Sequence, residues 1–218
     1  MTGEPVTDES PKGPVQVRAG RLEGASFAAQ LHATEIADGF LSSLGPRFLR
    51  PLYRRITRTQ GSFLLIAEAD GHPVGFVAGS MDVGQLYRQF FRRDGLLAVA
   101  SAPWRLLVSW RRVLETLRHG RSDEAPVGGE LLAIAVDPSW RSRHVGLELV
   151  RAFVAELETM AAVGAHVVVG ADNDAAIALY HRCGFVSARQ FQFHSGTTSL
   201  LLTKALDDPA SSRPPTSP

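Results

Sequence analysis

The stretch that decides the fold runs from residue 130 to residue 157 and reads ELLAIAVDPSWRSRHVGLELVRAFVAEL. Its apolar run over 131–136 predicts a strand that stops at Asp137-Pro138, and apolar residues then recur at helical spacing from Gly146. A basic loop, residues 141–146, joins the two. Because the first N–H groups of a helix are unpaired and partly positive, this arrangement is suited to bind an anion such as a pyrophosphate.

The chain downstream of this stretch continues the alternation of strands and helices. The helix that begins at Gly146 is expected to run to Gly164, and residues 166–169 are typical of a strand. Asn173 or Asp174 can cap a further short helix, which ends at Gly184. Residues 186–193 and 197–204 predict a closing strand pair. Strand, helix, strand in this order indicates a βαβ unit within a mixed α/β domain.

The chain upstream begins with a strand candidate at 15–18. Apolar spacing predicts a first helix over 27–44 and a second over 48–56, in which Pro51 should kink or shorten the helix. Two β-rich runs, 62–68 and 73–80, flank the turn Asp70-Gly71 and predict a hairpin.

Residues 173–185 read NDAAIALYHRCGF and are similar to a segment of the GCN5-related N-acetyltransferase (GNAT) superfamily. The segment has the pattern Asn-x-x-Ala-x-x-x-Tyr-x-x-x-Gly-Phe, and five residues fall in register: Asn173, Ala176, Tyr180, Gly184 and Phe185. The basic loop resembles the family pattern Arg/Gln-x-x-Gly-x-Gly/Ala at Arg141 and Gly146. Ser142 and His144 stand where that loop commonly has glycine.

The resemblance implies a single α/β (α+β) domain over residues 15–206. It has a mixed, mostly antiparallel, twisted sheet of about six to seven strands flanked by helices, with a basic helical insertion, residues 86–121, between strands 3 and 4. Residues 1–14 and 207–218 are rich in Pro, Ser, Gly and charge, and we expect both to be disordered tails.

The resemblance also implies acetyl-coenzyme A as co-substrate. In the family, the contacts to this molecule come from the strand end, the basic loop and the start of the helix after Asn173. The asparagine itself contacts the pantetheine arm. Carried over, they are Ile134, Ala135, Val136, Arg141, Ser142, Arg143, His144, Val145, Gly146, Asn173 and Ala176. A backbone N–H near Val136, where the family's strand has a bulge, would polarise the thioester carbonyl. His144 could touch a phosphate or be a solvated loop residue.

Two residues are candidates for proton transfer. Tyr180 matches the family residue that donates a proton to the coenzyme A sulfur, and a phenol with an ordinary pKa of ~10 carries that proton at neutral pH. The alternative is a tyrosine that packs on the sheet. Glu130 lies six residues before Val136, the spacing of a general-base glutamate in the family. Strict alternation would place it on the face of Leu132, Ile134 and Val136. Alternatively it is an exposed acid, and a water chain or loop residue is the base.

The insertion holds eight arginines against Asp94 and Glu115, a net charge of +6 in a chain whose formal net charge is +1. Apolar residues at helical spacing among the arginines predict two amphipathic helices that pack on the domain and cover the acceptor cleft. The alternatives are a homodimer contact or a peripheral membrane contact, since Trp104 and Trp110 beside arginines suit a headgroup zone. No reading motif for nucleic acid accompanies the charge.

Other function classes are disfavoured. The longest apolar runs are far below the ~18 residues that span a bilayer, and the first ten residues lack a signal-peptide pattern, so we expect a cytoplasmic protein. One cysteine, Cys183, expected to be an inert thiol, and seven histidines without helical pairing predict no metal site.

The expected reaction is direct transfer of an acetyl group to a primary amine of an unidentified small molecule, amino sugar or peptide. We expect the residues that select this acceptor to lie in 40–58 and in the insertion. A non-catalytic acyl-coenzyme A sensor and a transferase of longer acyl groups are the alternatives.

Overall fold

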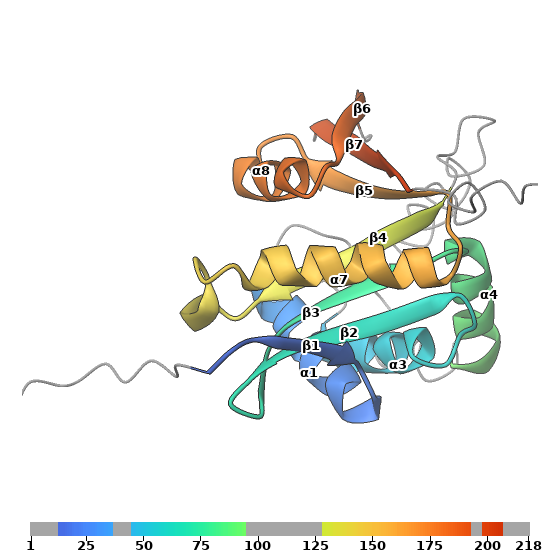
Figure 1. The fold of residues 1–218 in the computed structure, drawn as a ribbon. Helices are drawn as coiled ribbons and strands as arrows, with labels where there is room; N and C mark the ends of the chain where they lie inside the picture. Colours follow the sequence, from blue (N-terminus) through green and yellow to red (C-terminus); the bar gives the residue numbers. More distant parts are fainter. Residues whose placement is uncertain (1–12, 37–44, 95–127, 193–197, 207–218) are drawn as a thin grey trace, which may run out of the picture.

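The computed structural model describes residues 13–36, 45–94, 128–192 and 198–206. In these ranges seven strands form one sheet in the order β1-β2-β3-β4-β5-β7-β6. β4 and β5 are parallel, and the other neighbours are antiparallel (Figure 1). The strands are β1 (Gln16–Ala19), β2 (Ser62–Ala69), β3 (His72–Ser80), β4 (Gly129–Val136), β5 (Gly164–Gly170), β6 (Val186–Gln192) and β7 (Thr198–Ala205). The predicted fold class is confirmed.

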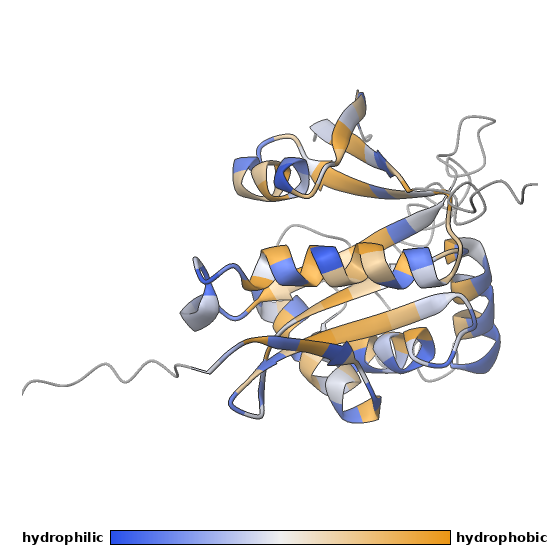
Figure 2. Cartoon of the chain, in the orientation of Figure 1, coloured by the Kyte–Doolittle hydropathy of each residue, from blue (hydrophilic) through white to orange (hydrophobic). Residues whose placement is uncertain are grey.

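The helices cover both faces of the sheet, each over its own apolar cluster. One face carries α1 (Leu22–Glu35), α3 (Pro46–Ile56) and α4 (Val83–Arg93), whose buried side chains meet those of β2, β3 and β4. The other face carries α7 (Val145–Thr159), and α8 (Asp174–Arg182) joins the same cluster through Tyr180. Figure 2 shows apolar residues concentrated on the strands between these helix layers. None of the helices in the described ranges is long and apolar enough to cross a bilayer.

Several predicted elements form for the local reasons expected. Asp70 and Gly71 both have positive φ, 51° and 77°, which is the backbone of a tight hairpin turn between β2 and β3. Asn173 caps α8, because its side chain accepts a hydrogen bond from the N–H of Ala176. Gly184, with φ 85°, follows that helix as predicted.

Two of the predicted helices have wrong boundaries. The first helix begins at Leu22 and ends at Glu35, whereas the spacing of large apolar residues predicted a helix over 27–44. Its buried face is built mainly by Ala25, Ala28 and Ala29, and small residues give a weak periodic signal. α7 ends at Thr159 and not at Gly164.

The predicted insertion contributes α4, which lies between β3 and β4. Leu86 and Phe90 of α4 are buried in the core, and Arg55 of α3 donates a hydrogen bond to Asp94 at the end of α4, at 2.7 Å. α4 is therefore a packed part of the domain. Residues 95–127, which include the second helix predicted in the insertion, lie outside the described residues, as do 1–12, 37–44 and the predicted C-terminal tail.

A bulge in β4 changes which side chains share a face. Ala133 pairs with Ala78 and Leu131 pairs with Gly79, so that Leu132 is an extra residue in the strand. Leu132 and Ala133 consequently both belong to the cluster under α1, α3 and α4, whereas Ile134 packs against the α7 cluster. The predicted alternation of Glu130 with Leu132, Ile134 and Val136 on one face is therefore wrong beyond Leu132. The bulge also lies four residues before Val136, not next to it.

Strands β4 and β5 are paired only where both begin. Their register covers Gly129–Leu131 against Ala165–Val167. Beyond these pairs, β4 continues beside β3 as far as Val136, and β5 continues beside β7 as far as Gly170. Figure 1 shows the two parts of the sheet diverging from this short junction, with α8 and the start of α7 at the wide end.

Candidate active site

The three segments singled out in the sequence meet at the wide end of this divergence. A side-chain carbon at Gly146, in the first turn of α7, would lie 3.2 Å from Leu179 of α8 and 3.9 Å from Val136 of β4. Glycine at 146 thus allows the helix start, the strand end and α8 to approach one another closely. The two halves of the predicted motif, which end at Gly146 and begin at Asn173, are therefore neighbours in the fold.

The basic loop adopts a glycine-like backbone without the usual glycines. Ser142 and His144 both have φ 62°, in the left-handed region. These are the two positions at which the family pattern commonly has glycine, so their side chains are accommodated in the loop shape that glycine would favour. Val145, buried beside this loop, anchors the start of α7 in the core.

The arginines of the loop contact neighbouring groups. Arg141 forms an ion pair with Glu35 at the end of α1. The guanidinium of Arg143 lies 5.1 Å from the centre of the Trp140 ring. Both arginines and His144 remain largely exposed. The loop therefore offers positive charge to solvent in front of the first turn of α7.

Tyr180 is both a packing residue and a candidate acid. Its side chain is buried, and its ring centre lies 5.7 Å from that of Phe185. Burial, and then the neighbouring Cys183, raise the pKa of the Tyr180 phenol above its ordinary value. The phenol therefore holds its proton throughout the neutral range. Burial likewise raises the pKa of the Cys183 thiol, which disfavours the nucleophilic thiolate.

Glu130 lies at the junction of β4 and β5. It pairs with Ser80 on one side and His166 on the other, and its carboxylate is 3.6 Å from Nε2 of His166. The Nδ1 atom of His166 is buried and has no hydrogen-bond partner among the described residues. Burial, and then the Glu130 carboxylate, raise the pKa of Tyr87 on α4. Glu130 therefore faces the α4 side of the sheet, with its side chain one-third exposed.

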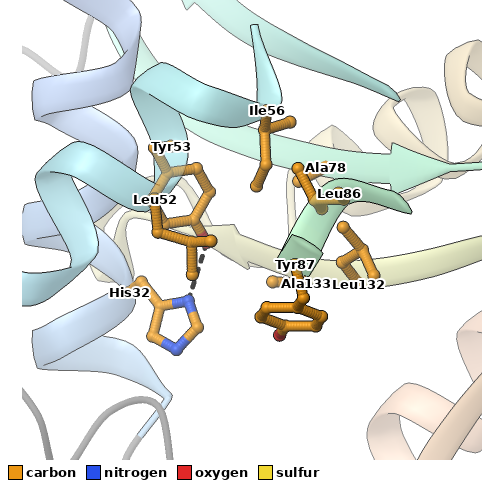
Figure 3. A pocket seen from close by; sticks show the side chains of 9 residues that line it. All are labelled: His32, Leu52, Tyr53, Ile56, Ala78, Leu86, Tyr87, Leu132 and Ala133. Carbon is orange, nitrogen blue, oxygen red and sulfur yellow. Dashed lines mark hydrogen bonds between the residues drawn. The ribbon is translucent and has the colours of Figure 1, made fainter. Parts of the chain in front are cut away.

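A cavity on the same side contains polar residues that the sequence did not point out. It is lined by nine side chains from α1, α3, α4, β3 and β4, and Figure 3 shows them. Nδ1 of His32 and the hydroxyl of Tyr53 are 2.7 Å apart across it, and both residues are buried. Burial lowers the pKa of His32 from 6.5 to about 4, so that the ring is neutral at pH 7.

Only a weak signal in the sequence could have indicated these residues. His32 and Tyr53 occupy core positions of α1 and α3, where a polar tip among apolar neighbours suggests a partner. Their pairing depends on how the two helices pack, which residue spacing does not reveal. Among the described residues, no group of three or more His, Cys, Asp or Glu side chains is arranged to hold a metal ion.

The fold and the meeting of these segments agree with the acetyltransferase family that the sequence resembles. The model of the acetyltransferase (GNAT) family matches residues 32–185, and the chain belongs to this family. A curated relative, mycothiol acetyltransferase of Paenarthrobacter aurescens (strain TC1), is 32% identical over 98 residues. That match covers 44% of this chain and 29% of the relative, so the chain spans less than a third of the relative's length.

Solved structures share the fold at low sequence identity. The Salmonella typhimurium protein yncA, solved with its cofactor acetyl-CoA, has a TM-score of 0.59 at 15% identity, over 90% of this chain and 96% of that one. The ribosomal-protein-S18-alanine N-acetyltransferase of Escherichia coli has a TM-score of 0.54 at 14% identity, over 88% of this chain and 94% of that one.

Proposed function

We propose that the protein transfers an acetyl group from acetyl-coenzyme A to a primary amine. The observation that carries this proposal is the divergence of β4 and β5 towards the loop and α8. Over residues 132–136 and 168–170, the two strands no longer pair with each other. An extended pantetheine arm can hydrogen-bond along β4 there as an added strand.

The donor would bind along the whole divergence. The backbone of Ile134, Ala135 and Val136 would pair with the pantetheine arm. The loop from Arg141 through Ser142, Arg143, His144 and Val145 to Gly146 would hold the pyrophosphate, because the N-terminal amides of α7 and the guanidinium groups favour anions. Asn173 and Ala176, at the start of α8, would contact the arm from the opposite side. The match to yncA, whose cofactor is acetyl-CoA, supports this choice of donor.

In the reaction, the amine lone pair attacks the thioester carbonyl carbon, and the carbon–sulfur bond breaks. The thiolate that leaves takes the proton of Tyr180, and a base removes the extra proton of the new amide nitrogen. Glu130 is our candidate base, because its carboxylate faces the same side of the sheet as the cavity. The β4 bulge at Leu132 makes a backbone amide near this residue the candidate for polarising the carbonyl.

Replacement of Tyr180 by Phe tests the acid. Turnover should fall about tenfold or more, since general acid catalysis contributes ~10²–10⁴-fold, while acetyl-coenzyme A still raises the melting temperature. Cys183→Ala is the control and should keep wild-type turnover. Wild-type turnover of Tyr180→Phe would remove Tyr180 from the mechanism. A melting temperature unaffected by any coenzyme A derivative would contradict the proposed donor.

The alternatives change the donor or the chemistry. The loop lacks two of the family's usual glycines, which favours a non-catalytic acyl-coenzyme A sensor, yet Ser142 and His144 adopt the glycine-like backbone, and this weakens the case for a sensor. A panel of acyl-coenzyme A donors would reveal a preference for longer groups. A cytoplasmic location, a homodimer and a membrane contact through 86–121 remain predictions without support from the described residues.

A further inference from the structure

The cavity between α1, α3, α4 and β4 is small and mostly apolar. It offers about 20 Å³ to the centres of water-sized molecules, which is enough for one such group. Six of its lining residues are apolar: Leu52, Ile56, Ala78, Leu86, Leu132 and Ala133. The other three are His32, Tyr53 and Tyr87, and none of the nine carries a carboxylate.

The cavity lies next to the proposed site of reaction. Its β4 wall is Leu132 and Ala133, the residues directly after the last pair that joins β4 to β5. Glu130, two residues earlier, is close enough to Tyr87 to affect its pKa. A group in this cavity would therefore lie beside the β4 residues that follow the junction, on the side of the sheet that Glu130 faces.

The polar groups of the cavity have fixed orientations. The contact between His32 and Tyr53 holds the imidazole, which also stacks on Phe76 with a ring separation of 6.5 Å. In Figure 3 the second ring nitrogen of His32 points away from Tyr53, and the phenol of Tyr87 lies on the other side of the group of lining residues from Tyr53. No described residue hydrogen-bonds to that phenol. Among the described residues, these two groups are therefore without a competing partner and could bind a ligand.

Resting on the proposed acetyl transfer, we propose that this cavity receives the acceptor's amino group and selects amines carried on a compact apolar group. His32 accepts a hydrogen bond from the amine at Nε2, with Nδ1–H donating to Tyr53, which acts as a positioning residue. The apolar walls favour the neutral amine, the form with a free lone pair for attack. Because the cavity has room for the amino group alone, the group that carries the amine would lie at the partly buried Leu132 and Ala133, where a second ammonium or several hydroxyls would lose water without gaining partners from these side chains; this disfavours polyamines and amino sugars.

A panel of acceptors tests the substrate class. Thiol release from acetyl-coenzyme A is measured with isobutylamine, 2-phenylethylamine, spermidine, glucosamine and glycylglycine at one pH. We expect kcat/KM for one of the two apolar amines to exceed that of the other three by about tenfold or more. Release that is fastest with spermidine, glucosamine or glycylglycine overturns this inference and leaves the proposed function standing. Release with none of the five, while acetyl-coenzyme A still raises the melting temperature, also overturns this inference alone; no release together with an unchanged melting temperature overturns both.

Variants test the two named residues. His32→Gln should raise the KM of the best apolar amine by about tenfold, with the KM of acetyl-coenzyme A within about twofold of wild type. Tyr53→Phe, which keeps the packing and removes the contact to Nδ1, should raise the amine KM less and in the same selective way. His72→Gln, at an exposed histidine of β3, is the control. If both cavity variants change the KM of acetyl-coenzyme A as much as that of the amine, or neither changes the amine KM, the assignment is overturned. Melting temperatures identify a variant that fails to fold. If His32→Gln is such a variant, the amine KM of Tyr53→Phe decides whether the assignment stands.

Discussion

At the scale of single residues, His32 combines burial with a titratable group. It is 4% exposed, and its pKa falls from 6.5 to about 4 on folding because the charged ring loses its hydration. Above pH 6.5 the ring is neutral in both states. Between pH 6.5 and 4 the unfolded chain binds a proton that the folded chain does not, so stability is lost as the pH falls through this window.

We therefore predict a pH-dependent loss of stability that belongs to His32. Between pH 6.5 and 4, the contribution of His32 to the free energy of unfolding should fall by about 3 kcal/mol, which is the free energy that corresponds to the change in its pKa. Urea unfolding at a series of pH values measures it. His32→Gln should flatten that part of the profile, and His72→Gln should keep it. Parallel profiles of wild type and His32→Gln would show that His32 is not the cause.

The loop residues Ser142 and His144 have backbone conformations that destabilise the folded state, because their side chains are poorly suited to positive φ. A left-handed conformation costs a non-glycine residue about 1–2 kcal/mol, and glycine adds about 0.5–1 kcal/mol of backbone entropy to unfolding. Ser142→Gly should therefore stabilise the protein by up to about 1 kcal/mol and raise the melting temperature by a few degrees. Ser142→Ala keeps the strain and should not stabilise. Equal effects of both substitutions would refute the explanation.

At the scale of elements, α8 depends on Asn173 for its start. The side-chain oxygen accepts the N–H of Ala176 at 3.1 Å, so the residue expected to touch pantetheine also has a structural task. Serine can replace the capping oxygen but has no carboxamide N–H, and alanine supplies neither.

The two roles of Asn173 can be separated. Asn173→Ala should lower the free energy of unfolding by about 1 kcal/mol, whereas Asn173→Ser should leave it nearly unchanged. If the carboxamide binds the donor, Asn173→Ser should still raise the KM of acetyl-coenzyme A several-fold. Thermal melts and initial rates measure the two effects. A wild-type KM in Asn173→Ser would reduce Asn173 to a helix cap.

The elements that the sequence predicted well are those encoded locally. The Asp70-Gly71 turn and the Asn173 cap identify their hairpin and helix from adjacent residues, and the motif identified Tyr180 as a candidate. The resemblance implied a bulge near Val136, but its position at Leu132 was not predictable, because it exists only in the register between β3 and β4. The pairing of His32 with Tyr53 likewise depends on the packing of α1 against α3, two helices whose contact no local pattern describes.

At the scale of the whole molecule, the sheet has two parts with one short junction. β1 to β4 form one part, and β5, β7 and β6 form the other, joined by the pairs from Gly129 to Leu131 with Ala165 to Val167. α7 packs against strands of both parts, and its first turn contacts α8 at Leu179. A donor that binds along the divergence would therefore touch both parts at once and oppose their separation.

This bridging predicts where acetyl-coenzyme A should slow amide hydrogen exchange. At a concentration ~100 times its dissociation constant, a ligand stabilises the bound form by ~2.7 kcal/mol, and amides that exchange through opening of the divergence should slow by about 100-fold. We expect this effect at residues 132–136 and 168–170, whose strands separate there. Fraying amides of β6, an exposed edge strand, should exchange at unchanged rates because their opening does not release the ligand. Exchange followed by mass spectrometry or NMR, with and without acetyl-coenzyme A, measures both sets. Equal slowing in β6 and in the divergence, or a raised melting temperature without slowing at 132–136, would mean that the donor binds elsewhere.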